Sequence, residues 1–155
     1  MRTRTIHEDS GQRTLVAILE TGDEVIGCLQ RLAREQRLSA AQISAIGAFS
    51  RAVLMYFDWE RKQYSKIPVD EQVEVASLAG DVALDENGEP ALHLHAVLGR
   101  RDGSALAGHV GEGFVRPTLE VVITESPAHL HRVKDPESGL ALIRPRKEQP
   151  DADRS

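Results

Sequence analysis

The order of apolar and polar side chains predicts a protein built mostly of strands, with one helix. Residues 14–20 form a short apolar run with β-branched side chains, which indicates a first strand. The segment Thr21-Gly22-Asp23 offers a helix cap. Ser39-Ala40-Ala41-Gln42 has the form of a capping box and would start one further turn of helix. Between these two segments, apolar residues recur at helical spacing and form one stripe: Val25, Ile26, Leu29, Leu32 and Ala33.

The rest of the chain has the pattern of short strands separated by turn residues. In the strand predicted at 72–84, the side chains become small toward Gly80, which indicates that neighbouring backbone approaches closely there. Short connections imply that neighbouring strands are antiparallel. The predicted strands lie at residues 43–49, 52–59, 63–68, 72–84, 91–99, 104–114 and 118–124.

These elements predict an α+β fold, with a mostly antiparallel central sheet of about seven strands and one main helix. The 155 residues suit one domain, expected at residues 11–143, after an N-terminal extension at 1–10 and before a disordered tail at 144–155. One helix of about four turns cannot cover such a sheet. Loops, curling of the sheet or other subunits must cover the rest, so we expect an oligomer.

A predicted hairpin at residues 91–114 carries the candidate chemistry. His93 and His95 have the same parity, so both side chains leave the same face of a strand, with Cα atoms about 6.6 Å apart. The alternate positions supply an apolar face that can be buried: Leu92, Leu94, Ala96 and Leu98.

The position of His109 depends on the turn between the two strands. If the loop has two residues, Asp102 and Gly103, His109 lies across from Ala96, on the apolar face. If the loop has three residues and Gly103 is left-handed, His109 lies opposite His95. A bulge before the histidine would also shift the register by one residue. We expect the register that brings the three histidines together.

Three neutral imidazoles suit zinc, or another divalent transition metal, and leave a fourth coordination position for water, substrate or a neighbouring subunit's side chain. His93, His95 and His109 are therefore the candidate metal ligands. A second pair, His129 and His131, lies in a polar, irregular stretch without a third histidine nearby in the sequence, and is predicted to lie on the surface.

Composition narrows the range of partners and compartments. The formal net charge of −5 and the aromatic content of 4% argue against a surface that grips nucleic acid by charge or by base stacking alone. The single cysteine, Cys28, cannot form an internal disulfide, so a structural thiol in a reducing cytoplasm is expected. No long apolar run is present, so we expect no signal peptide, no membrane-spanning segment and no membrane partner.

Four groups of residues stand in a characteristic order and spacing: IGAFS at 46–50, EVASLAG at 74–80, PALHLH at 90–95, and GHV at 108–110 with LEV at 119–121. They resemble the PPC domain, a family shared by plants and prokaryotes. The likeness covers residues 11–144, and it implies an α+β protomer with a central antiparallel sheet, assembled as a homotrimer. Some prokaryotic members look like metal binders at the positions that match His93, His95 and His109.

The resemblance also bears on DNA. In plant members the domain stands beside an AT-hook with an Arg-Gly-Arg-Pro core, and the nearest segment here, Arg144-Pro145-Arg146-Lys147, lacks the glycine. Plant members use a Gly-Arg-Phe-Glu-Ile-Leu stretch for partner contacts. The matching residues here, 71–76, keep the glutamate of that stretch but lack its arginine and phenylalanine. Bacterial and archaeal members are commonly assigned to DNA binding by analogy with the plant proteins.

Three functions follow from these observations. The favoured one is a homotrimeric, DNA-associated or regulatory protein with a histidine metal site, zinc being the expected metal. The second is a metal-dependent hydrolytic enzyme, although the sequence has no serine elbow, Cys-His constellation or phosphate loop, and no catalytic residue is assigned. The third is a small-molecule sensor whose site between subunits binds an anion or a metabolite through the metal, Arg100 or Arg116. The candidate general bases of the enzyme are Asp81, Asp85, Glu112 and Glu120.

Overall fold

The computed structural model of the chain describes residues 1–145. Most of the tail predicted at 144–155, including Arg146 and Lys147, lies outside the described residues. The described part contains one helix and nine strands: β1 (Arg2–Asp9), β2 (Gln12–Glu20), α1 (Val25–Glu35), β3 (Ala40–Asp58), β4 (Gln63–Val69), β5 (Val73–Leu84), β6 (Pro90–Gly99), β7 (Ala105–Glu125), β8 (Arg132–Lys134) and β9 (Ala141–Ile143).

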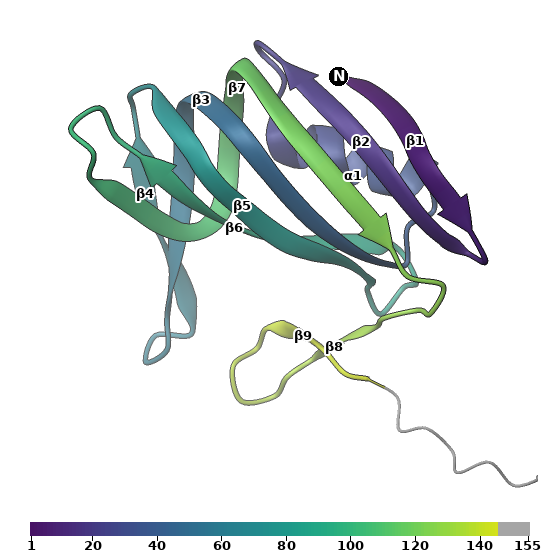
Figure 1. Cartoon of the computed structure of the whole chain (residues 1–155). Helices are drawn as coiled ribbons and strands as arrows, with labels where there is room; N and C mark the ends of the chain where they lie inside the picture. Colours follow the sequence, from purple (N-terminus) through teal and green to yellow (C-terminus); the bar gives the residue numbers. More distant parts are fainter. Residues whose placement is uncertain (146–155) are drawn as a thin grey trace, which may run out of the picture.

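Seven of the strands form one antiparallel sheet in the order β1-β2-β7-β6-β5-β3-β4. β7 also pairs with β3, so β3, β5, β6 and β7 close into a ring and the sheet curls. The helix α1 packs on one face of this sheet, and the β8–β9 hairpin lies beyond its lower edge in Figure 1. The prediction of an α+β fold with a mostly antiparallel sheet of seven strands and one helix is confirmed.

β3 and β7 are longer than predicted. The predicted strands at 43–49 and 52–59 are one strand, β3, and those at 104–114 and 118–124 are one strand, β7. The β3–β7 pairing contains register shifts after Gly47, Phe49 and Val53. Such bulges bend a strand while the hydrogen-bonded ladder continues, so the turn-forming residues inside both segments do not end the strands.

Both predicted helix caps were wrong. The N-cap of α1 is Glu24, whose carboxylate accepts the backbone N–H groups of Ile26 at 3.1 Å and Gly27 at 2.7 Å. Asp23, in the predicted cap, lies 2.9 Å from the N-terminal amino group instead. The predicted capping box at 39–42 starts no helix, because β3 begins at Ala40 and pairs on both sides, with β5 and β7.

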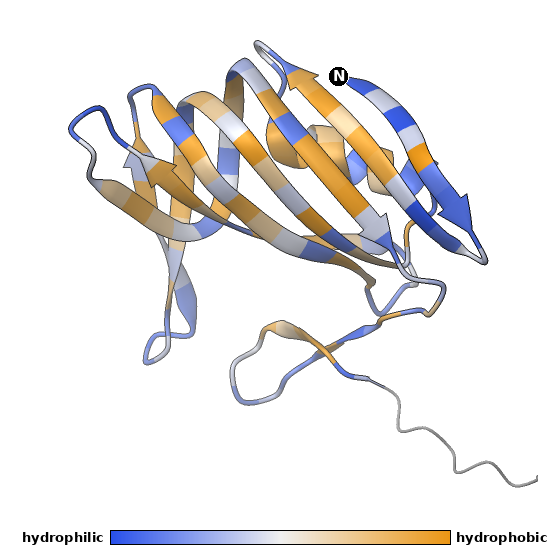
Figure 2. Cartoon of the chain, in the orientation of Figure 1, coloured by the Kyte–Doolittle hydropathy of each residue, from blue (hydrophilic) through white to orange (hydrophobic). Residues whose placement is uncertain are grey.

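Residues 2–9, for which no strand was predicted, form β1 and pair with β2 along the edge of the sheet. β1 is exposed throughout and largely hydrophilic, as Figure 2 shows. An edge strand of this kind needs no buried face, so its sequence lacks the alternation that indicates a strand. No helix among residues 1–145 has the length and apolar character needed to cross a membrane.

The hydrophobic core lies between α1 and the sheet. In β6, Leu94, Ala96 and Leu98 are buried toward this core, as their alternation predicts. Cys28 is also buried there, and burial raises the pKa of its thiol, which is consistent with the structural role expected for it. The opposite face of the sheet, called here the open face, carries His95 and the exposed side chain of Val97.

Candidate metal centre

The turn between β6 and β7 sets the register of the histidines. The backbone N–H of Arg100 donates to the carbonyl oxygen of Ser104 at 2.8 Å, and Gly103 is left-handed with φ of 84°. These features define the three-residue loop, and His95 pairs directly with His109 across the two strands. The expected register is thus confirmed, because an odd number of loop residues places both imidazoles on the open face.

His93 is positioned by the close approach of the β5 and β6 backbones. His93 pairs with Asp81 of β5, and Gly80 lies beside it. A Cβ atom at position 80 would overlap the carbonyl oxygen of His93. The small residues at this end of β5 therefore allow β6 to lie close against it, as the sequence predicts.

The three imidazoles converge on one point. One ligand atom from each of His93, His95 and His109 lies within 4.8 Å of the others, and the ring centroids are 5.0–5.3 Å apart. The Nε2 atoms of His93 and His95 are 3.1 Å apart. Two nitrogens bound to one tetrahedral zinc would be about 3.3 Å apart. Among the described residues, the buried Nδ1 atom of His109 has no hydrogen-bond partner, so the donor set fits a single metal ion.

Two of these imidazoles are held in the neutral form. Burial and, to a smaller extent, the charges of His93, His95 and Arg132 together lower the pKa of His109 to about 4. Burial also lowers the pKa of His93, followed by the charge of Arg132. A neutral imidazole has the free lone pair that a metal ion requires, so this site is prepared for metal at neutral pH.

The lowered pKa of His109 predicts that the metal-free protein loses stability in acid. Between pH 6.5 and about 4, the unfolded chain takes up a proton on this residue that the folded chain does not, so the free energy of unfolding falls as the pH falls. Solvent screening of the partly exposed ring limits the loss to about 1–2 kcal/mol. Urea unfolding with chelator present, at pH 7.5 and 4.5, measures it. The His109→Gln variant removes this titration, and an unchanged pH dependence in that variant would contradict the assignment.

The second histidine pair is separate from this centre. His129 is exposed and its Nδ1 atom lies 2.7 Å from the hydroxyl oxygen of Ser39, as predicted for a surface residue, while His131 is half-buried. Within residues 1–145, neither belongs to a group of three metal-ligating side chains.

The candidate general bases do not face the histidines as free carboxylates. Asp81 is adjacent to His93 but forms an ion pair with Arg132. Asp85 accepts backbone N–H groups within its own turn. Glu112 and Glu120 are exposed on β7, and none of the four carboxylates lines the cavity beside the histidines.

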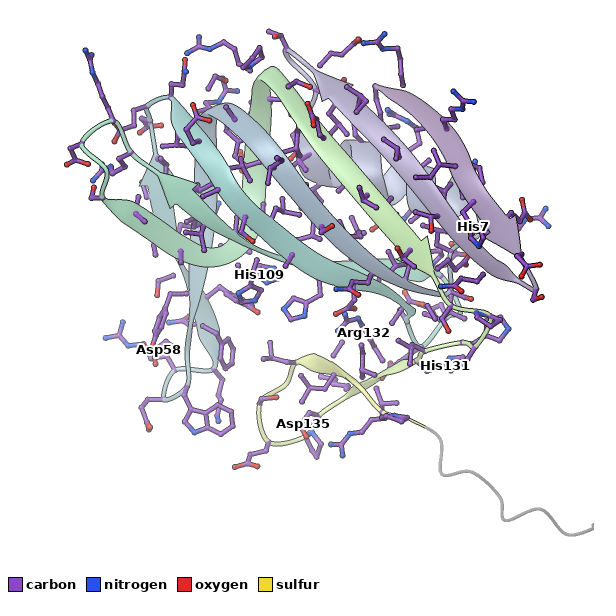
Figure 3. All side chains as sticks on the ribbon, in the orientation of Figure 1. His7, Asp58, His109, His131, Arg132 and Asp135 are labelled. Atoms are coloured by element: carbon purple, nitrogen blue, oxygen red, sulfur yellow. The ribbon has the colours of Figure 1, made fainter. Side chains whose placement is uncertain are left out.

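The arginine beside the histidines is one that sequence reasoning missed. Arg100 pairs with Glu71, and Arg116 donates to Gln72 at 3.0 Å; neither lines the cavity beside the histidines. Arg132 does line it. In Figure 3, the side chains of His109 and Arg132 lie between the sheet and the β8–β9 hairpin. No local pattern marks Arg132, because its place depends on how the hairpin folds back on the sheet.

The fold and the site together define a class: an α+β protein whose curled antiparallel sheet gathers three imidazoles on its open face. Residues 6–127 match the sequence profile of the Plants and Prokaryotes Conserved (PCC) domain. The chain belongs to this family, the PPC domain family.

Solved structures of the same shape include relatives from archaea and bacteria. The plant- and prokaryote-conserved protein of Pyrococcus horikoshii is 32% identical, with a TM-score of 0.79 over 87% of this chain and 93% of its own. A protein of Archaeoglobus fulgidus described as metal-containing is also 32% identical, with a TM-score of 0.78 over 85% and 93%. A Ralstonia eutropha protein, whose description proposes DNA binding, is 28% identical, with a TM-score of 0.79 over 85% and 91%. The comparison with curated proteins gave no match.

Proposed function

We propose that this protein is a homotrimeric, metal-binding PPC-domain protein that holds one zinc ion per chain through His93, His95 and His109. The convergence of three ligand atoms within 4.8 Å carries the proposal. The metal-containing relative from Archaeoglobus fulgidus supports it. When bound by three neutral imidazoles, zinc acts as a Lewis acid with one open coordination position.

The test is metal analysis of the purified protein. We expect the wild type, stripped with chelator and supplied with zinc, to retain about one ion per chain and to unfold at a higher temperature, because a ligand that binds only the folded state stabilises it. His95→Ala is expected to lose both effects. Absence of zinc from the reloaded wild type, or equal binding by His95→Ala, would overturn the metal centre.

The open face supports assembly. Cross-strand pairing places five uncharged side chains in one row across it: Val122, Ser44, Ala79, His95 and His109. On the same part of the sheet, Ile46 is 60% exposed. Contact with other copies would bury this apolar surface, and the PPC resemblance implies a trimer. Light scattering should give three times the chain mass; a monomer at micromolar concentration would contradict this part of the proposal.

DNA association is the second candidate, and one surface favours it. Four of the six aromatic residues gather on the β3–β4 hairpin, which also carries exposed basic side chains. Trp59 at its tip is 50% exposed, and the Lys62 ammonium lies 3.3 Å from its ring centroid. Exposed rings with nearby cations are suited to bases and phosphates. The aromatic and basic residues are Tyr56, Phe57, Trp59 and Tyr64 with Arg61, Lys62 and Lys66.

A gel shift at two salt concentrations tests this second candidate. Binding should be visible at low salt, weaken at physiological salt, and weaken further in a Trp59→Ala/Lys62→Ala variant. No shift at low salt would remove direct DNA binding, because phosphate contacts are strongest there.

A further inference from the structure

A cavity of about 250 Å³ lies between the histidines and the β8–β9 hairpin. Such a volume holds a molecule of about eight non-hydrogen atoms, since each water of a liquid occupies about 30 Å³. Its apolar wall comes from Leu92 of β6 and from Leu140 and Leu142 of the hairpin. Its polar wall is formed by His93, His109, Arg132 and Tyr64. The cavity therefore suits a small molecule with one polar end and one apolar end.

Arg132 is the most unusual group in this wall. Its side chain is only 7% exposed, and its guanidinium pairs with the carboxylate of Asp81 and donates to the carbonyl oxygen of Ala141 at 3.1 Å. Its buried Nε atom has no partner among residues 1–145. A buried N–H group without an acceptor costs about 1–3 kcal/mol. The strained hydrogen bonding of this guanidinium makes Arg132 the charged donor group in the wall of the cavity.

The charges around the cavity favour an anion. Three neutral imidazoles would leave both positive charges of a divalent metal ion uncompensated. Asp81, paired with Arg132, cancels only the charge of that arginine, and no carboxylate from residues 1–145 lines the cavity. When it holds a divalent metal ion, a site of this kind attracts a negatively charged ligand, because a partly buried charge is stable only when it is paired.

We propose that the cavity binds a small organic monocarboxylate, with its carboxylate between the metal ion and Arg132 and its hydrocarbon part against Leu92, Leu140 and Leu142. This inference rests on the metal centre proposed above. An inorganic phosphate would satisfy Arg132 but gain nothing from the apolar wall, and an uncharged amide of the same shape would leave the metal charge unbalanced. Carboxylate geometry, with two oxygens in one plane, also suits a guanidinium.

The experiment uses the full chain loaded with cobalt, whose visible absorption reports on its ligands. Butyrate, butyramide and inorganic phosphate are titrated separately, with calorimetry on the zinc-loaded protein as a second readout. We expect butyrate to change the cobalt spectrum and to bind at least tenfold more tightly than either butyramide or phosphate.

Two variants and a matched control locate the binding. Arg132→Met should weaken butyrate at least tenfold while cobalt is retained. Arg144→Met is the control, because Arg144 is an exposed arginine near the same hairpin, pairs with Asp135 at 3.1 Å and does not line the cavity. Since Arg132→Met leaves Asp81 without its partner and can destabilise the fold, Ala141→Phe gives an independent test. It fills the cavity, keeps every charge, and should also abolish butyrate binding.

The outcomes separate the two proposals. If the wild type retains neither cobalt nor zinc, the proposed metal centre is wrong, and so is the carboxylate site that depends on it. If it retains metal but butyrate binds no better than butyramide, or binds Ala141→Phe as it binds the wild type, the metal centre stands and the carboxylate site is wrong. If phosphate binds more tightly than butyrate, the proposal that the ligand is an organic molecule is wrong.

Discussion

Replacing His109 by alanine is expected to lower the affinity for zinc about a thousandfold. Even groups that only orient a metal ligand contribute about 10–100-fold to affinity, so removal of one of three ligands costs more. The loss should come without unfolding, because the removed ring has a buried Nδ1 atom with no hydrogen-bond partner among residues 1–145. Competition with a chromophoric zinc chelator measures the affinity, and circular dichroism verifies the fold.

His129→Ala is the matched control for this variant. His129 is an exposed histidine on the same chain, lies in the other His-x-His pair, and is hydrogen-bonded to the Ser39 hydroxyl. Its replacement should leave zinc affinity within about twofold of the wild type, since surface changes away from a site have small effects. Retention of zinc by His109→Ala within tenfold of the wild type would show that the three imidazoles do not act together.

Phe49→Ala is expected to lower the free energy of unfolding by about 3–5 kcal/mol, as large-to-small changes in a packed core do. Phe49 is fully buried where β3 bends between its two halves. Its ring lies so close to Gly113 of β7 that a Cβ atom there would be 2.8 Å from it. The collapse of neighbouring atoms into the vacated space is limited, because the backbone at Gly113 of β7 lies directly against this ring.

Urea denaturation of the metal-free protein, at one fixed protein concentration, measures this effect. Tyr56→Ala on the same strand is the control, because Tyr56 is 67% exposed and its loss should change the free energy of unfolding by less than about 1 kcal/mol. A Phe49→Ala effect no larger than that of Tyr56→Ala would mean that the bend of β3 is not held by this ring.

The histidine hairpin could be predicted because all of its determinants are local. The alternation of His93 and His95 with apolar residues fixes their face, and the length of the loop containing Gly103 fixes the register of His109. These relations extend over fewer than twenty residues and depend on strand geometry alone. The zinc assignment itself stays a prediction, since it concerns a bound ion.

Errors arose where local signals compete with pairing. Strand ends were predicted around residues 50–51 and 115–117, but β3 and β7 continue through them because each pairs with several strands. The capping-box pattern at 39–42 was overridden in the same way. A local preference of about 1 kcal/mol cannot outweigh a ladder of hydrogen bonds with buried side chains on one face.

The sequence by itself determined the α+β class, the single main helix, the apolar face of β6 and the register that gathers three histidines, because periodicity and loop length act through neighbouring residues. Only the tertiary structure decided the closure of β3, β5, β6 and β7 into a ring and the place of Arg132. Arg132 meets Asp81 across 51 residues of chain, and such a contact exists only after the β8–β9 hairpin has folded back on the sheet. The polar environment of the proposed metal centre is therefore a property of packing, while its ligands are a property of the sequence.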